Sequence, residues 1–359
     1  MTERICIVTN SLSLGGAERI SLLLAEWLHS KNVEVALITL NKDREKGYKL
    51  PKGINRIPIN ENSGNSKMRI ISDLRKCLKE YKPSVVLVMG VPLCIYVIPA
   101  LIGLKMPVIV SERNDPSHFA GKSSTKFISR KLMKYADGYV FQTQGAQEYY
   151  SKSIQEKSTI IPNPLMIENM PRPYIGEKKK KIVTVGRLVP QKNHELLIRA
   201  FKEIKDTYSD YTLSIYGNGK DYHKLKDLIM ELGMESSVIL EGTRENIFDE
   251  IIDSEMFVLS SDFEGMPNAL IEAMALGLPV ISTACPSGGP AALINHMKNG
   301  LLTPIRDKEK LTEAIKLLIE DENLSNSLAK NAVKIRKELN QERICKMWLN
   351  YFRDISRII

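Results

Sequence analysis

Short apolar runs alternate with longer amphipathic segments along almost the whole chain. The apolar runs are rich in Val and Ile, as in strands that are buried on both faces, and the segments between them space apolar residues as in helices. This alternation predicts an α/β protein in which crossover helices connect parallel strands. Strands are expected near residues 4–9, 33–40, 84–90, 107–111, 138–142 and 158–161, and then near 182–186, 211–217, 237–240, 255–259, 279–282 and 300–303.

A charged, proline-containing interval from Asn163 to Lys181 interrupts this alternation and is typical of an interdomain hinge. The 359 residues also exceed the roughly 250–300 over which a single hydrophobic core grows. We therefore expect two doubly wound domains, 1–168 and 169–338, with ligands bound at the carboxyl ends of the strands in a cleft between them. Residues 324–359 are expected to be helical throughout, and their last part, 339–359, to pack back on the first domain.

The uncharged run from Pro83 to Leu104 is long enough to span a bilayer. Gly90, Pro92 and Pro99 interrupt it, and it begins with β-branched residues. We therefore favour a buried strand, a turn and a short buried helix over a transmembrane span. No secretory signal is expected at the N-terminus, because charged residues precede only a short apolar stretch.

Composition narrows the class of protein. With 43% hydrophobic residues and no low-complexity tract, the chain is neither disordered nor fibrous. Its five cysteines are scattered and form no CxxC pair, which argues against a disulfide scaffold or a cysteine zinc site and fits a reducing cytoplasm.

The net charge of +9 belongs to the first half of the chain. Residues 1–170 hold 24 Lys and Arg against 15 Asp and Glu, whereas residues 171–359 hold 27 of each. A basic domain suits nucleic acid, an anionic membrane surface or a phosphorylated substrate, and the asymmetry alone leaves all three open.

A glycine pair, Gly15-Gly16, follows the first expected strand and precedes an amphipathic segment. Glycines at such a turn let backbone N–H groups approach a phosphate at the positive end of a helix. Tight packing of the helix on the sheet is an equally good explanation. The chain contains neither the G-x-G-x-x-G pattern of simple NAD binding nor the G-x-x-x-x-G-K-[ST] pattern of a P-loop.

The second half contains two stronger motifs. The loop after its first strand places two cations, Arg187 and Lys192, five residues apart. Farther along, Glu264 and Glu272 flank Pro267, which suits the first turn of a helix. One carboxylate would then lie in the loop and the other inside the helix, so the two can contact different parts of one ligand.

Together these motifs resemble the retaining glycosyltransferases of family 4, which have the GT-B fold of two Rossmann-like domains facing across a cleft. The resemblance covers essentially the whole chain. It rests on the order and spacing of Gly15-Gly16-Ala17-Glu18, Gly186-Arg187 with Lys192-Asn193, Glu264 with Glu272, and Pro279-Val280-Ile281-Ser282-Thr283 with Gly288-Gly289-Pro290.

The resemblance implies roles for these residues toward a nucleotide-sugar donor. Arg187 and Lys192 would bind the diphosphate and stabilise its developing charge without a metal, Glu264 would contact the transferred sugar, and Glu272 the ribose. No convincing DxD-type carboxylate pair is present, and neither a metal nor another cofactor is expected. The further donor-binding residues implied are Gly15, Gly16, Gly217, Asn218, Thr243, Gly265, Met266, Pro267, Asn268 and Ala269.

Retention of configuration is also implied by the resemblance alone. Two carboxylates suggest double displacement, as in retaining glycosidases. We favour the family's usual mechanism, in which the acceptor hydroxyl attacks from the face of the departing phosphate, because Glu272 is assigned to ribose and Glu264 to hydroxyl contacts.

The acceptor is expected in the first domain, at a loop containing Glu112, Arg113, Asn114 and His118. Arg113 stands where relatives carry a His, and a permanent cation suits phosphate or sugar-hydroxyl binding rather than base catalysis. His118 is either its substitute or an ordinary loop residue. A second departure is Pro290-Ala291-Ala292, where relatives have Glu after the proline, and nothing in the sequence explains it.

The basic residues of the first domain concentrate in segments 66–82 and 122–134. In the second, Lys122, Lys126, Arg130 and Lys134 recur every four residues and would line one helical face, as in helices that lie on anionic lipid. A solvated outer face is the alternative.

We therefore predict a bacterial enzyme on the cytoplasmic face of the plasma membrane that transfers a hexose or N-acetylhexosamine from a UDP-sugar to a lipid-diphosphate-linked saccharide in capsule, O-antigen or related glycan assembly. An epimerase or phosphorylase on the same fold is the second hypothesis. Nucleic-acid binding is disfavoured, because no known module is present and aromatic residues do not alternate with the cations.

Overall fold

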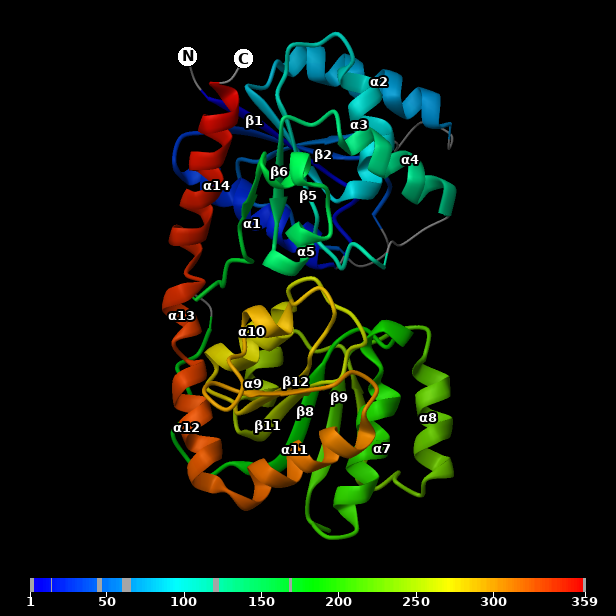
Figure 1. Ribbon diagram of the computed structural model, residues 1–359, viewed down its shortest axis with the longest axis vertical. Helices are drawn as coiled ribbons and strands as arrows, with labels where there is room; N and C mark the ends of the chain where they lie inside the picture. Colours follow the sequence, from blue (N-terminus) through cyan, green and yellow to red (C-terminus); the bar gives the residue numbers. More distant parts are fainter. Residues whose placement is uncertain are drawn as a thin grey trace. The chain divides into compact units, whose positions relative to one another are not determined.

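The computed structural model describes residues 3–13, 15–43, 47–59, 66–118, 123–167 and 170–357 (Figure 1). The chain divides into two compact units. Unit 1 comprises Met1–Pro164 and Gln341–Ile359, and unit 2 comprises Leu165–Asn340. The divisions therefore lie four and two residues from the positions, 168 and 338, at which we expected the domains to end.

Unit 1 contains a seven-stranded parallel sheet with the strand order β3-β2-β1-β4-β5-β6-β7. The six strands expected in this half are confirmed. Strand β3 was missed because its sequence, Asn-Arg-Ile-Pro, contains no apolar run and its residues at the sheet edge are half exposed. The strands are β1 (Arg4–Thr9), β2 (Glu34–Thr39), β3 (Asn55–Pro58), β4 (Val85–Met89), β5 (Val108–Ser111), β6 (Gly138–Phe141) and β7 (Ser158–Ile160).

Helices cover the sheet of unit 1, and apolar side chains of the strands and helices form its core. The uncharged run 83–104 forms β4, a turn and α3, as expected. No helix in the described ranges combines the length and apolar character that crossing a bilayer requires. The helices are α1 (Gly16–Ser30), α2 (Lys67–Tyr81), α3 (Cys94–Leu101), α4 (Ser123–Met133), α5 (Gln144–Glu148), α6 (Lys152–Gln155) and α14 (Gln341–Ser356), with a 3₁₀ turn at Val91–Leu93.

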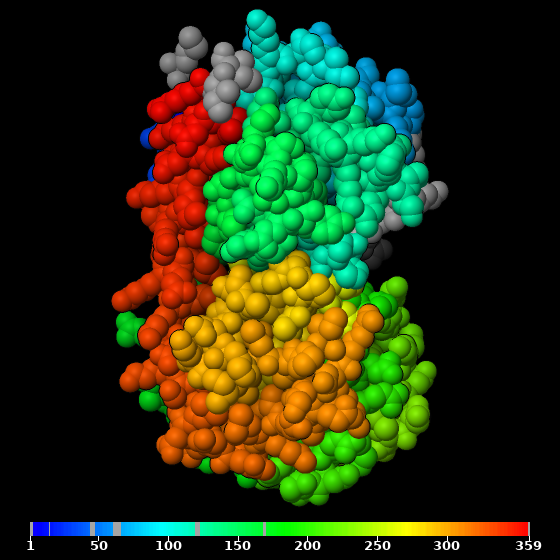
Figure 2. All heavy atoms as spheres, in the orientation of Figure 1, coloured from blue at the N-terminus to red at the C-terminus, as the bar shows by residue number. Residues whose placement is uncertain are grey.

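The C-terminal helix α14 belongs to unit 1. The indole of Trp27 on α1 donates to Glu342 at 2.6 Å, and the Tyr351 hydroxyl accepts from the backbone of Tyr139 at 2.9 Å and donates to that of Lys157 at 2.7 Å. In Figure 2 the red C-terminal segment lies beside green atoms of unit 1.

Unit 2 contains a six-stranded parallel sheet with the order β10-β9-β8-β11-β12-β13 and its own apolar core. All six strands expected here are confirmed. They are β8 (Lys179–Val185), β9 (Thr212–Tyr216), β10 (Val238–Gly242), β11 (Ser254–Leu259), β12 (Val280–Thr283) and β13 (Leu301–Thr303). The helices are α7 (His194–Lys205), α8 (Tyr222–Glu231), α9 (Ile247–Ile251), α10 (Asn268–Ala275), α11 (Lys308–Glu320), α12 (Glu322–Ala332) and α13 (Ile335–Glu338), with 3₁₀ turns at Pro190–Lys192 and Pro290–Ala292.

Two expectations about unit 2 were wrong. Lys179–Lys181, assigned to the hinge, begin strand β8, where Lys179 is neutralised by Asp253 at 2.6 Å and Lys180 by Asp210. Residues 324–359 are not helical throughout, because the chain leaves the helix between α12, α13 and α14. At the second break Asn340 forms a β-bridge with Leu165, which joins the two ends of unit 2.

Candidate active site

The loop after β8 carries the two cations singled out in the sequence. Arg187 is exposed, whereas Lys192 lies mostly buried at the end of a 3₁₀ turn. Asn193 follows in the left-handed conformation (φ 44°) and caps α7 by accepting from the backbone N–H of Leu196 at 3.2 Å. This sharp reversal directs the helix into the core and leaves Lys192 beside the neighbouring loop.

His194 contacts the backbone of Arg187. Its imidazole is buried at the start of α7, and Nε2 lies 3.3 Å from the Arg187 carbonyl oxygen. Burial lowers the pKa of His194 to about 4, and the nearby Lys192 cation acts in the same direction. The ring is therefore neutral near pH 7 and donates from Nε2 to this carbonyl.

Hydrogen bonds join this loop to the loop after β11, since β8 and β11 are neighbours in the sheet and end on the same edge. Asp262 N–H donates to the Gln191 carbonyl at 2.9 Å, and the Gln191 side chain donates to the Phe263 carbonyl at 2.9 Å. Asn193 Nδ2 donates to Asp262 Oδ1 at 2.8 Å. The two loops thus form one framework.

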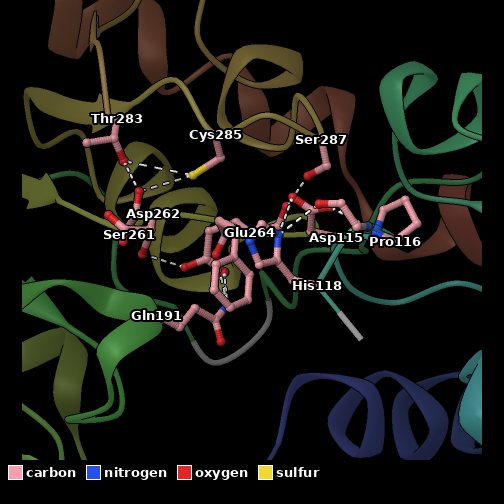
Figure 3. A network of polar contacts seen from close by, with 12 residues as sticks. Asp115, Pro116, His118, Gln191, Ser261, Asp262, Glu264, Thr283, Cys285 and Ser287 are labelled. Carbon is pink, nitrogen blue, oxygen red and sulfur yellow. Dashed lines mark hydrogen bonds and ion pairs between the residues drawn. The ribbon is translucent and has the colours of Figure 1, made fainter. Parts of the chain in front are cut away.

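Glu264 lies at the centre of this framework and is only 6% exposed. Lys192 Nζ contacts its Oε1 at 2.6 Å, Ser261 Oγ donates to the same oxygen at 2.6 Å, and Gln191 Nε2 lies 3.5 Å from Oε2. The Ser287 hydroxyl donates to its backbone carbonyl. Figure 3 shows Glu264 together with Gln191, Ser261 and Ser287. A buried carboxylate is stable here because a cation and a hydroxyl both bind it.

The two glycine and threonine turns predicted near the donor meet at the same edge of the sheet. Gly217 N–H donates to the Gly242 carbonyl at 2.8 Å, and Asn218 Nδ2 donates to Thr243 Oγ1 at 3.0 Å. Gly217 has φ 138°, and a Cβ there would lie 2.0 Å from the carbonyl oxygen of Gly186. A glycine is therefore required where this turn packs on the Arg187 loop.

The structure places Glu264 in the loop before α10 and Glu272 inside that helix, half-buried. Pro267 is the N-cap residue and not, as expected, part of the first turn, because the helix begins at Asn268. A Cβ at Gly289 would lie 1.6 Å from the Gly265 carbonyl oxygen, so the Gly288-Gly289 turn packs directly on the predicted donor segment. That segment is Gly265, Met266, Pro267, Asn268 and Ala269, of which Met266 is 8% exposed.

Sequence reasoning missed the residues that hold this framework together. Gln191 and Asn193 lie inside the recognised loop, and Ser261 and Asp262 lie two and three residues after the end of strand β11. Polar residues just beyond a strand's carboxyl end were therefore the available signal. Ser287 precedes the recognised glycine pair. Among the residues that the structure describes, no group of three or more His, Cys, Asp and Glu could hold a metal ion.

In unit 1, the predicted glycine pair begins α1, with Gly15 as N-cap residue and Gly16 as the first helical residue. A Cβ at Gly15 would meet the Glu18 carboxylate at 2.2 Å, which is the flexible end of a side chain. The Tyr48 hydroxyl donates to the Gly15 carbonyl at 3.3 Å. A side chain at position 15 could therefore be accommodated by a shift of the Glu18 side chain. At Gly217 or Gly289 it would require a shift of backbone atoms, which is harder to accommodate.

The predicted acceptor loop follows β5. Glu112 is buried, which raises the pKa of its carboxyl, while the Tyr150 hydroxyl at 2.8 Å and the Arg113 N–H at 3.0 Å stabilise its charged form. Arg113 Nη2 donates to Asn163 Oδ1, which also accepts from Gln142 Nε2 at 2.7 Å. Burial lowers the pKa of Arg113 to about 10.

Within the described ranges, two nitrogens of the Arg113 guanidinium have no acceptor. Its Nε and Nη1 are enclosed and hydrogen-bond to no residue of the described ranges. Asn114 is half-buried on the same loop, and its N–H lies 3.4 Å from Glu112 Oε1. His118, which is exposed, has its Nδ1 3.4 Å from Asp115 Oδ2 and 2.9 Å from Ser117 Oγ.

Some cations of the basic segments 66–82 and 122–134 bind backbone carbonyls of unit 1. Arg75 on α2 donates to the carbonyls of Ala100 and Ile102, the latter at 2.6 Å. On α4, Lys126 donates to the Ser117 carbonyl at 3.0 Å and Arg130 to that of Pro116. Lys126 and Arg130 were expected to face lipid. They instead bind the backbone of the predicted acceptor loop. Lys122, the first cation of the same series, lies outside the described residues.

Two family models match the chain, Glycosyl transferases group 1 over residues 167–335 and Glycosyltransferase Family 4 over residues 14–168. An uncharacterized glycosyltransferase of Methanocaldococcus jannaschii is 30% identical over 325 residues, which cover 76% of this chain and 80% of the relative. A Campylobacter jejuni protein, named as an N-acetylgalactosaminyltransferase with a diphospho-undecaprenol-linked acceptor, is 28% identical over 97% of this chain and 99% of its own.

Solved structures share the fold at low sequence identity. The Anabaena protein HepE in complex with UDP-glucose has a TM-score of 0.83 at 18% identity, covering 98% of this chain and 99% of its own. Sucrose-phosphate synthase of Thermosynechococcus elongatus has a TM-score of 0.87 at 16% identity, covering 99% and 100%. These likenesses confirm the two-domain fold predicted from the sequence.

Proposed function

Because the chain is a glycosyltransferase of the family 4 type with the GT-B fold, we propose that it transfers a hexose or N-acetylhexosamine from a UDP-sugar to a polyprenyl-diphosphate-linked saccharide. The named acceptor of the Campylobacter jejuni relative supports the lipid-linked class, and the UDP-glucose bound to HepE supports the donor class. A relative from Erwinia amylovora is named as an amylovoran biosynthesis glycosyltransferase, which supports a role in polysaccharide assembly.

The observation that carries the donor assignment is the Lys192–Glu264 pair at 2.6 Å. It joins a cation suited to phosphate and a carboxylate suited to sugar hydroxyls on one framework. When the nucleotide departs, negative charge develops on its diphosphate, and Lys192 together with the exposed Arg187 would stabilise that charge. Donor binding would draw Lys192 toward phosphate and leave Glu264 for the sugar.

The residues proposed for the remaining donor contacts lie at the same edge of the sheet. Glu272 on α10 would hold the ribose hydroxyls, and the hydrogen-bonded Asn218 and Thr243 would approach the base or diphosphate. Two fixed cations support a reaction that needs no metal. Full turnover after removal of divalent cations with EDTA is the expected result, and activity that returns only with added metal would contradict this assignment.

The hydrogen bonds of Glu264 favour front-face displacement with retention of configuration. Both of its oxygens have donors within 3.5 Å, so the carboxylate is held for hydroxyl contacts and is a poor nucleophile. The anomeric configuration of the product, measured by NMR, should match that of the donor. A glycosyl adduct on Glu264 in intact-protein mass spectrometry would instead establish double displacement.

The acceptor would bind at the loop containing Glu112, Arg113, Asn114 and His118. There Arg113 offers two donors, which have no acceptor in the part of the chain that the structure describes, to a phosphate or hydroxyl oxygen. The lipid carrier of that acceptor would bring unit 1 to the anionic inner face of the plasma membrane through segments 66–82 and 122–134. Exposed cations of the first segment, Lys67, Arg69, Lys76 and Lys79, support this electrostatic contact.

The test is a thermal-shift screen of UDP-, GDP- and ADP-sugars, followed by turnover on short polyprenyl-diphosphate-linked acceptors. A UDP-sugar should raise the Tm, and transfer should release UDP in proportion to the product. Stabilisation by none of the nucleotide sugars would overturn the donor assignment. Epimerised donor without transfer would assign the site to the second hypothesis.

A further inference from the structure

Helix α4 has two faces with different partners. Lys126 and Arg130, four residues apart, reach the carbonyls of Ser117 and Pro116, and the Arg130 guanidinium also lies 4.9 Å from the ring centre of Tyr149. This face is engaged within unit 1 and holds the acceptor loop.

The outward face carries large apolar side chains in solvent. Phe127 is 60% exposed and Ile128 48%, and Tyr135, in the turn that follows the helix, is 75% exposed. Lys131 lies with Nζ 4.4 Å from the Phe127 ring centre, and Lys134 is exposed beside Tyr135. Residues 123–136 contain no acidic side chain.

A single exposed apolar residue is ordinary, but three on one short stretch, interleaved with lysines, are not. Aromatic and aliphatic side chains with lysines between them suit the boundary between lipid head groups and acyl chains, where rings enter the apolar layer and ammonium groups meet phosphates. A second copy of the chain fits poorly, because it would oppose lysines to lysines.

We propose that α4 is an interfacial anchor, in which Phe127 and Ile128 insert into an anionic bilayer while Lys131 and Lys134 bind its phosphates. This deepens the membrane contact of the proposed function, because it assigns the apolar part of the contact and moves the cationic part from Lys126 and Arg130 to the outward lysines. Since the inner face of the same helix holds Ser117 and Pro116, docking would bring the acceptor loop to the membrane surface.

The test measures co-sedimentation of the full chain with vesicles of phosphatidylcholine, with and without phosphatidylglycerol. Replacing both apolar residues, Phe127→Ser with Ile128→Ser, should weaken binding to the anionic vesicles by about tenfold or more. Replacing both outward lysines by Gln should weaken it by about tenfold and reduce its salt dependence. Met230→Ser, at an exposed apolar residue of α8, is the matched control and should bind like the wild type.

Insertion has a direct readout that does not depend on turnover. Both native tryptophans are buried, so the indole of a Phe127→Trp variant should show a blue-shifted emission on adding anionic vesicles, whereas that of Met230→Trp should not. Donor stabilisation, measured separately by thermal shift, should be unchanged in all these variants. It reports on the proposed donor site and fails independently of the anchor.

Two outcomes overturn the anchor. One is binding of the Phe127→Ser, Ile128→Ser variant that equals that of the wild type. The other is self-association of the wild type, lost in that variant and seen without any vesicle binding, which would assign the face to a second copy of the chain.

Discussion

The two units share an architecture, but the cations that we propose to bind substrate have different surroundings in each. In unit 2, Lys192 contacts Glu264 at 2.6 Å, and Ser261 and Gln191 complete the contacts of that carboxylate. In unit 1, the Arg113 guanidinium donates to Asn163, and two of its enclosed nitrogens have no acceptor among the described residues. The described residues of unit 2 therefore pair their buried cation with a carboxylate, whereas those of unit 1 leave two nitrogens of Arg113 without an acceptor.

This difference follows from which strands neighbour each other. Strands β8 and β11 are adjacent, so their loops can exchange hydrogen bonds and bring Lys192 to a carboxylate 72 residues away. In unit 1, the carboxylate next to Arg113 in sequence, Glu112, binds Tyr150 and backbone N–H groups instead. A buried donor without an acceptor costs about 1–3 kcal/mol, which a ligand oxygen at Arg113 would recover.

The largest effect is expected from Lys192→Ala, which breaks the paired site of unit 2. The substitution removes a cation from the departing phosphate and leaves Glu264 without its ion-pair partner, so kcat should fall by about 10²–10³-fold. Steady-state transfer from a UDP-sugar measures this loss. Lys202→Ala on α7, which breaks an exposed pair with Asp206 at 3.0 Å, is the control and should retain activity. Equal kcat values in the two variants would refute the role of Lys192.

A smaller effect is expected from pH, through His194. Its pKa is about 4 in the folded chain and near 6.5 when unfolded, so the unfolded state binds a proton first as the pH falls. The contribution of neutral His194 to the free energy of unfolding is complete above about pH 6.5. It is lost as the pH falls toward 4, by up to about 3 kcal/mol. Urea unfolding across this pH range should show a smaller decrease in the free energy of unfolding for His194→Gln than for the wild type.

The exposed His223 on α8 provides the control for this measurement. Unfolding free energies of His223→Gln should keep the pH dependence of the wild type. If His194→Gln also keeps the pH dependence of the wild type, the imidazole is not held neutral next to the Arg187 carbonyl.

The smallest effect, about tenfold, is expected for Arg113→Gln in unit 1. It removes a charge that has few partners, so the KM for the acceptor should rise while the KM for the donor and the Tm change little. Arg113→Lys should recover only part of the loss, because an ammonium lacks the planar donor set of the guanidinium. Arg75→Gln is the control, because Arg75 is a half-buried arginine that donates to the backbone carbonyls of Ala100 and Ile102. A large drop in Tm with an unchanged acceptor KM would make Arg113 a structural residue.

Much of the fold could be predicted because burial on both faces of a parallel sheet leaves an apolar run in the sequence. Twelve strands carry such a run, and the structure confirms them. Strand β3 does not, since it is half exposed at the edge of its sheet. The lysines at the start of β8 resembled a linker because only their partners, Asp253 and Asp210, neutralise them.

The sequence by itself determined the family, the two-domain architecture and the loops in which Arg187, Lys192, Glu264 and Arg113 lie, because these depend on local periodicity and motif spacing. Only the tertiary structure decided which charges are paired and which are free. The four-residue spacing on α4 placed Lys126 and Arg130 on one face correctly, but whether that face meets lipid or the Pro116–Ser117 carbonyls depends on a loop packed against it. Periodicity records which side chains share a face, and packing between distant segments determines what that face contacts.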